Sequence, residues 1–84
     1  GDFLILSAIH GVDAEVMEFE VSDRSKILEG EIKNLGLPED ALIGGVIRNN
    51  KGLIPTGDFQ ILPGDKVVVF AKNNCAKKMT RYFR

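Results

Sequence analysis

The stretch that decides the fold runs from Val46 to Phe70 and reads VIRNNKGLIPTGDFQILPGDKVVVF. It contains one phrase twice, because Gly57-Asp58 precedes the apolar residues Phe59, Ile61 and Leu62, and Gly64-Asp65 precedes the apolar residues 67–70. Glycine reaches positive φ at low cost and aspartate hydrogen-bonds its own backbone, so both are turn residues. β-Branched and aromatic runs bounded by such turns are typical of strands. Short strands spaced this closely leave little room for catalytic machinery, which indicates a binding or regulatory module.

The first half of the chain predicts one strand and one helix. Residues 12–21 alternate between apolar and polar with one change of phase, which predicts a strand containing a β-bulge. Apolar residues at i, i+4 and i+7 then predict an amphipathic helix that Gly36 and Pro38 end: Leu28, Ile32 and Leu35. Gly30 lies inside this helix and costs about 1 kcal/mol relative to alanine, so we expect it to permit a close approach by a neighbouring element.

The second half predicts further strands and a last helix. Strands are expected at residues 41–48, where Gly44-Gly45 interrupts the pattern, at residues 53–54 before Pro55, and at residues 66–71. Asn73-Asn74 are expected to cap a final helix whose apolar face is formed by Cys75, Met79, Tyr82 and Phe83. The order is β-α-β-β-β-α, which predicts a small single α+β domain with a mainly antiparallel sheet and two helices. Residues 1–12 are read as a linker or an N-terminal strand, and residues 13–84 as the domain itself.

Length and composition set limits on function. Eighty-four residues make one domain, and a chain this short buries a modest share of its surface and gains from association. No apolar run approaches the roughly 20 residues of a membrane helix, and no secretory signal pattern is present. The single cysteine, Cys75, fits a reducing compartment.

The net charge of −1 conceals two opposite halves. Residues 1–44 hold ten acidic and three basic residues, a net charge of −7, whereas residues 45–84 hold two acidic and eight basic residues, a net charge of +6. This division suits self-association or an anionic ligand on the second half. The alternative is that the two halves interleave in the fold and mix their charges on the surface.

Catalytic, metal and nucleic-acid sites are poorly supported. One histidine, His10, and Cys75, which is expected in the core, assemble no nucleophilic pair. The acidic residues of 13–20 offer oxygen ligands, but we favour a solvated strand edge protected by its charges and predict no metal site. The final helix carries four cations, which we interpret as a solvated face rather than a nucleic-acid surface: Lys77, Lys78, Arg81 and Arg84.

The candidate binding site lies where the strand 41–48 ends. Arg48 presents a planar fork that suits bidentate contact with phosphate. Asn49 and Asn50 tolerate turn conformations and can hydrogen-bond a base or a ribose, while apolar walls are available from Ile47, Ile54 and Pro55. The alternative is that Arg48 makes a surface salt bridge and the two asparagines only form a turn. The residues alone leave both interpretations open.

The order of these motifs resembles the C-terminal domain of TrkA-type potassium-transport regulators, the RCK-C or TrkA-C domain. The matching phrases are Ile47-Arg48-Asn49, Gly52, Ile54-Pro55-Thr56-Gly57-Asp58 and Gly64-Asp65-Lys66-Val67-Val68-Val69. Upstream, residues 14–21 match the family's acidic first strand, and Leu35-Gly36-Leu37-Pro38 matches its Leu-x-Leu-Pro helix end. The resemblance extends over about residues 13–83.

The resemblance implies a cytoplasmic, non-enzymatic regulatory domain of a potassium-uptake or cation-transport system. Its implied partners are a second copy of itself, a larger ring in the full-length protein, an upstream Rossmann-type domain and a membrane-embedded potassium transporter subunit. It implies a nucleotide second messenger, cyclic di-AMP, bound between two copies at Ile47, Arg48, Asn49, Asn50, Ile54 and Pro55. The fingerprint G-x-G-x-x-G is absent, so NAD(H) or ATP is expected only in the separate upstream domain.

Two other classes of function remain as alternatives. One alternative is a structural dimerisation module that binds no ligand. RCK-C domains also recur as accessory domains of cation/proton antiporters and of transcription regulators. The residues that precede this segment would discriminate among these classes, because each carries a different neighbouring domain.

Overall fold

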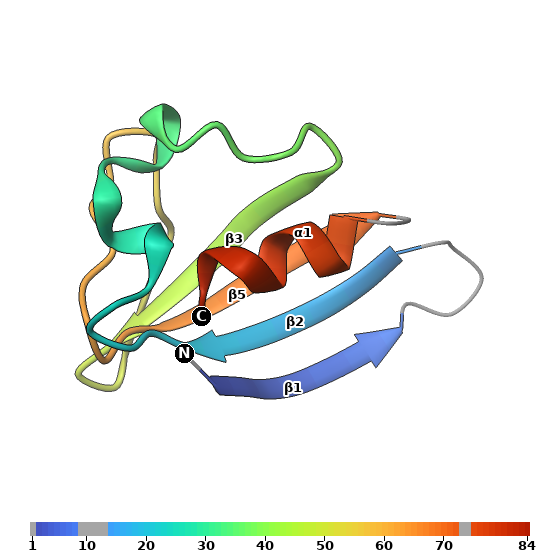
Figure 1. Ribbon diagram of the computed structural model, residues 1–84. Helices are drawn as coiled ribbons and strands as arrows, with labels where there is room; N and C mark the ends of the chain where they lie inside the picture. Colours follow the sequence, from blue (N-terminus) through green and yellow to red (C-terminus); the bar gives the residue numbers. More distant parts are fainter. Residues whose placement is uncertain (1, 9–13, 73–74) are drawn as a thin grey trace.

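The computed structural model describes residues 2–8, 14–72 and 75–84, which form one antiparallel sheet with a helix on one face (Figure 1). The elements are β1 (Asp2–Ala8), β2 (Ala14–Glu20), η1 (Lys26–Glu29), η2 (Ile32–Asn34), β3 (Ala41–Arg48), β4 (Lys51–Leu53), β5 (Lys66–Lys72) and α1 (Cys75–Tyr82), where η marks a 3₁₀ helix. The strands lie in the order β1-β2-β5-β3-β4, and every neighbouring pair is antiparallel. The predicted α+β class and antiparallel sheet are confirmed.

The core lies between the sheet and α1. Strand β5 shows the alternation expected of a strand with one covered face, because Val67, Val69 and Ala71 are buried. Helix α1 contributes Met79, and Phe83 follows it with its ring stacked on that of Phe19 at a centroid distance of 4.2 Å. Cys75 is buried and free, as the sequence predicted. Asn73 and Asn74, the predicted cap of α1, lie outside the described residues.

The glycine pair in β3 marks a bulge. The register of β3 on β5 shifts between Ile43 and Gly45, so that Ile43 and Val46 both face the core although they are three residues apart. A Cβ atom on Gly44 would lie 2.3 Å from Cε2 of Phe70, so a larger residue here would displace the Phe70 ring. The bulge predicted in residues 12–21 is wrong for the described part of that segment, since β2 pairs with β5 residue for residue.

The first predicted helix is not an α-helix but two short 3₁₀ helices, η1 and η2. Gly30 between them is fully extended (φ 178°, ψ −173°), which ends helical hydrogen bonding. The backbone instead bonds to a distant segment: Ile32 N–H donates to Phe59 O (3.1 Å) and Lys33 N–H to Gly57 O (2.9 Å). These two segments lie side by side at one end of the sheet (Figure 1). The apolar spacing was real, because Leu28, Ile32 and Leu35 pack against the core.

Two further expectations about this region are corrected. No atom lies within 4 Å of a Cβ built on Gly30, so its predicted role in close packing is wrong. The strand expected at residues 59–62 is reduced to an isolated bridge between Glu31 and Gln60. At the N-terminal end, β1 occupies Asp2–Ala8, for which the sequence predicted either a linker or a strand. Within the described residues, no helix is long and apolar enough to cross a membrane.

Candidate functional site

Arg48 lies at the end of β3, and its side chain is held by the turn that precedes β5. Its Nε donates to Oδ1 of Asp65 (2.9 Å) and its Nη2 to Oδ2 (2.7 Å), a bidentate pair. Nη2 also donates to the carbonyl of Gln60 (3.1 Å), and the guanidinium carbon lies 5.0 Å from the centre of the Phe59 ring. The guanidinium of Arg48, which the sequence predicted to bind a phosphate, therefore binds a carboxylate of the same chain.

Asp65 is buried with 2% of its surface exposed, and it organises the turn from Leu62 to Asp65. Oδ2 accepts a hydrogen bond from Leu62 N–H (2.9 Å), and Asp65 N–H donates to Leu62 O (3.2 Å). Gly64 has φ +86°, which explains the glycine before the aspartate. The Gly-Asp phrase was thus correctly read as a turn that bonds its own backbone.

The pKa of Asp65 lies below its ordinary value. Burial raises the pKa, but the hydrogen bonds from Arg48 and Leu62 N–H and the charge of Arg48 together outweigh burial. The hydrogen bond to Asp65 raises the pKa of Arg48, against a smaller opposite effect of burial. Both groups are therefore charged near neutral pH, and each stabilises the other.

Asn49 and Asn50 form the two-residue turn of the β3–β4 hairpin. Their φ angles are +52° and +64°, and Arg48 pairs directly with Lys51 across the turn. Two successive positive φ angles define the type I′ turn, for which asparagine is a favoured residue. Both side chains are exposed, so their amides face solvent beside the Arg48–Asp65 pair.

Of the predicted site residues, Arg48 and Asn49 line a common cavity at this hairpin end, and the other four do not. A depression of about 240 Å³ is lined by Arg48, Asn49, Leu62, Pro63, Gly64 and Asp65. Ile54 is 90% exposed, Pro55 and Ile47 are half-buried, and Asn50 lies on the hairpin tip. Sequence reasoning missed Asp65 and the turn before it as parts of the site, although the Gly-Asp phrase marked them. Ligand binding at these residues stays a prediction.

The open face of the sheet carries a second, more apolar cavity. Leu42 and Phe70 pair across β3 and β5 and are 59% and 39% exposed. They line a depression of about 360 Å³ together with Ala14, Glu39, Asp40, Ala41, Ala71 and Lys72. Exposed apolar side chains that adjoin one another are typical of an interaction surface.

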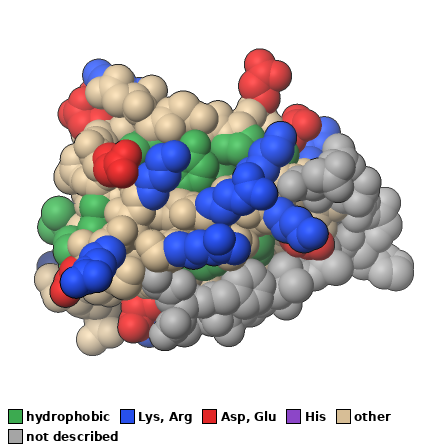
Figure 2. All heavy atoms as spheres, in the orientation of Figure 1, with side chains coloured by type: hydrophobic (Ala, Val, Ile, Leu, Met, Phe, Trp, Pro, Cys, Tyr) green, Lys and Arg blue, Asp and Glu red, His purple; other side chains and the backbone are tan. Residues whose placement is uncertain are grey.

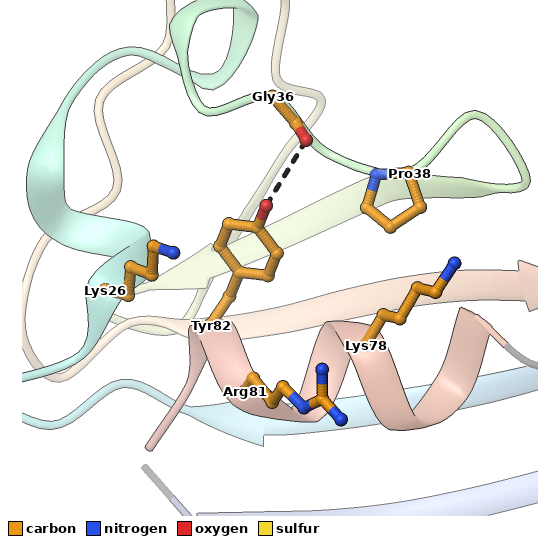
Figure 3. A pocket seen from close by; sticks show the side chains of 6 residues that line it. All are labelled: Lys26, Gly36, Pro38, Lys78, Arg81 and Tyr82. Carbon is orange, nitrogen blue, oxygen red and sulfur yellow. Dashed lines mark hydrogen bonds between the residues drawn. The ribbon is translucent and has the colours of Figure 1, made fainter.

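The sequence favoured a solvated acidic edge over a metal site. Among residues 14–72 and 75–84, no three His, Cys, Asp or Glu side chains stand close enough together to hold a metal ion. His10 and Asp13 lie outside the described residues. A third cavity, of about 370 Å³, lies between η1 and α1 and is lined by Lys26, Gly36, Pro38, Lys78, Arg81 and Tyr82 (Figure 3).

Known proteins resemble this chain over most of its length. Trk system potassium uptake protein TrkA homolog 1 of Methanosarcina mazei is 35% identical over 79 residues, which cover 94% of this chain and 18% of that protein. The TrkA homolog of Archaeoglobus fulgidus is 44% identical over 66 residues, 77% of this chain and 15% of that protein. The TrkA homolog of Pyrococcus abyssi is 35% identical over 69 residues, 81% of this chain and 30% of that protein. The chain thus spans less than a third of each of these relatives.

The fold is shared with a solved structure described as "Structure of RCK domain with cda". Its TM-score is 0.66 at 20% sequence identity, and the match covers 82% of this chain and 97% of that chain. The family model of the TrkA-C domain matches residues 16–84. Since that match covers most of the chain, from within β2 through α1 and including the hairpin end, the chain belongs to the TrkA-C domain family.

Proposed function

We propose that this chain is the regulatory domain of a potassium-uptake system in the cytoplasm, where it controls transport through rearrangement of paired domains. The observation that carries the proposal is membership of the TrkA-C family together with relatives named as Trk system potassium uptake proteins. The longer protein contributes an upstream Rossmann-type domain and docks on a membrane-embedded transporter subunit. This domain contributes no catalysis.

Pairing of two copies is the first element of the mechanism. The open face of the sheet supports it, because Leu42 and Phe70 remain exposed there while the opposite face is covered by α1. A second copy that buries these side chains removes apolar surface from water, which stabilises the pair by about 25 cal/mol for each Å² buried. Ile47 lies on this same open face, beside Lys66 of β5. Pairing over the open face therefore brings Ile47 of the two copies toward one another, whereas Arg48, the next residue of the strand, points to the other face.

A ligand that prefers one arrangement of the pair supplies the second element. Cyclic di-AMP, with two phosphates related by two-fold symmetry, matches a two-fold site between the hairpin ends of two copies. Asn49 and Asn50 present exposed amides, and Ile54 presents an exposed apolar side chain. A ligand shifts the arrangement only by its differential affinity for the two states.

The Arg48–Asp65 pair sets a limit on this site. Arg48 uses Nε and Nη2 in its hydrogen bonds to Asp65 and Gln60. Nη1 therefore remains available to a phosphate, and a bidentate contact through Nε and Nη2 does not. The Asp65 carboxylate also repels an approaching phosphate. Selectivity at this site therefore depends more on the asparagine amides and on burial of the bases than on Arg48.

The same geometry favours a second candidate function, a structural dimerisation module that binds no ligand. Arg48 is already paired within the chain, and Asn49-Asn50 are accounted for by the type I′ turn. Titration calorimetry of the chain against cyclic di-AMP, with ATP and NADH as controls, separates the two functions. Sedimentation equilibrium tests the pairing that both functions require, and a monomer at all accessible concentrations contradicts both.

Replacing Asn49 and Asn50 by glycine provides the sharpest variant. Glycine keeps the positive φ angles of the turn and removes both amides, so the hairpin is retained. We expect the affinity for cyclic di-AMP to fall about tenfold or more, because net hydrogen bonds contribute roughly 0.5–1.5 kcal/mol each. The exposed Lys51→Gln variant is the control on the same hairpin. No binding heat with the parent chain at millimolar cyclic di-AMP leaves the dimerisation module as the function.

A further inference from the structure

The cavity between η1 and α1 is lined by three cations and no carboxylate. Lys26 comes from η1, Lys78 and Arg81 come from α1, and the remaining walls are Gly36, Pro38 and Tyr82. Figure 3 shows the three basic side chains around the Tyr82 ring. The cavity of about 370 Å³ falls in the size range of small-molecule sites.

Like most basic residues in the described ranges, these three cations have no acidic partner, but they differ from the others in lining one cavity together. Within the described ranges, the salt bridges join Lys33 to Glu31 and Asp58, and Arg48 to Asp65. Lys26 instead lies 5.3 Å from the centre of the Tyr82 ring. Figure 2 shows basic side chains gathered over the α1 side of the molecule. A positive field is therefore concentrated at this cavity without internal neutralisation.

The walls of the cavity are fixed by packing and hydrogen bonds. The Tyr82 hydroxyl donates to the Gly36 carbonyl (3.2 Å) and approaches the Leu35 carbonyl (3.4 Å), which ties the loop 35–38 to α1. Helix α1 is anchored on its inner side by Met79, which is fully buried. Cations carried by fixed elements lose less freedom when a ligand binds than cations on mobile loops do.

We propose that this cavity binds the diphosphate group of a small molecule. A diphosphate ester carries roughly three negative charges near neutral pH, which matches the three cations. Arg81 can form a forked pair with one phosphate, while the ammonium groups of Lys26 and Lys78 act as point charges. The Tyr82 ring and Pro38 provide apolar surface for the rest of the molecule. The site shares no lining residue with the hairpin end, so it is independent of the proposed cyclic di-AMP site.

Calorimetric titration of the 84-residue chain with inorganic pyrophosphate at low ionic strength tests the proposal. Lys78→Gln and Arg81→Gln are each expected to weaken binding about five- to tenfold, because each removes a charge-assisted contact. Lys77→Gln is the matched control, since Lys77 lies on the same helix, carries the same charge and lines none of the cavity. The Asn49→Gly/Asn50→Gly variant is expected to bind pyrophosphate normally.

Three outcomes decide the proposal. A free diphosphate ligand is supported if pyrophosphate binding is saturable, is weakened by Lys78→Gln and is unchanged by Lys77→Gln. If pyrophosphate does not bind, but vesicles containing phosphatidylglycerol bind with the same dependence on Lys78 and phosphatidylcholine vesicles do not, the ligand is the single phosphate of a lipid headgroup, and the diphosphate proposal is overturned. Equal weakening by Lys77→Gln and Lys78→Gln, or no binding to pyrophosphate and vesicles alike, overturns the proposal.

Discussion

The hairpin end and the α1 face use basic residues in opposite ways. At the hairpin end, Arg48 is held by two bonds to Asp65, which is buried. At the α1 face, Lys26, Lys78 and Arg81 line a cavity without a carboxylate. A cation whose bonds are satisfied inside the chain stabilises the fold but offers little to a ligand. A cation without an internal partner contributes little to folding and leaves its charge available for binding.

The largest expected effect comes from breaking the pair at the hairpin end. Arg48→Ala leaves the buried Asp65 carboxylate with only the Leu62 N–H bond, so we expect the free energy of unfolding to fall by about 3 kcal/mol. Urea denaturation measures the loss. Arg48→Lys is expected to recover part of it, because an ammonium cannot reproduce the fork. A loss below about 1 kcal/mol for Arg48→Ala means that the pair is no stronger than an exposed salt bridge.

Acid should weaken the hairpin end selectively. The pKa of Asp65 in the fold lies below its ordinary value of 3.8, so its stabilisation is present above that pH and is lost as the pH falls toward the folded-state pKa. We expect Asp65→Asn to cost about 1–2 kcal/mol near neutral pH and to make the unfolding free energy less dependent on pH below about 4. Denaturation midpoints of both chains across this range measure the difference. Parallel pH profiles would show that Asp65 does not titrate with folding.

The contrast between the two regions was only partly visible in the sequence. The β-branched and aromatic run of residues 67–70 after the Gly64-Asp65 turn predicted β5, but the run did not show that Val67, Val69 and Ala71 are the residues that face the core. The helix expected from Leu28, Ile32 and Leu35 failed because the backbone found hydrogen-bond partners at residues 57–59, about 25 residues away in the chain. A spacing of four and three residues places side chains on the core in either conformation.

The site shows the same limit. Arg48 was singled out by its residue type, and Asp65 was read as a turn residue, but the bond between them depends on the register of β3 against β5. Lys78 and Arg81 were interpreted as part of a solvated helix face, and both are exposed, but sequence spacing could not show that Lys26 lines the same cavity. Which charged side chains pair is decided by contacts between segments that are distant in the sequence. The spacing of charged residues along the chain contains no information on those contacts.

A smaller effect is expected where the cavity wall is joined to α1. Tyr82→Phe removes the hydroxyl that donates to the Gly36 carbonyl and keeps the ring in place. We expect a loss of about 0.5–1.5 kcal/mol in the free energy of unfolding, the usual net value of one hydrogen bond. Thermal or urea denaturation measures it, with Thr80→Val as a comparison on the same helix. No loss at all would mean that the loop 35–38 is held by packing alone, and the wall would then be less rigid than the bonds suggest.

The smallest expected effect distinguishes the two regions most directly. Lys78→Gln should leave the free energy of unfolding unchanged or raise it by about 0.2–0.5 kcal/mol, because Lys78 and Arg81 are like charges at i and i+3 on α1. The gain should disappear at high salt, where the repulsion between exposed charges is screened. Urea denaturation at about 0.01 M and 1 M salt measures it, with Lys77→Gln as the control. A loss above about 1 kcal/mol would reveal an internal partner for Lys78, and the α1 face would then resemble the hairpin end. An unchanged fold together with lost pyrophosphate binding would place the charge of Lys78 in ligand recognition and not in stability.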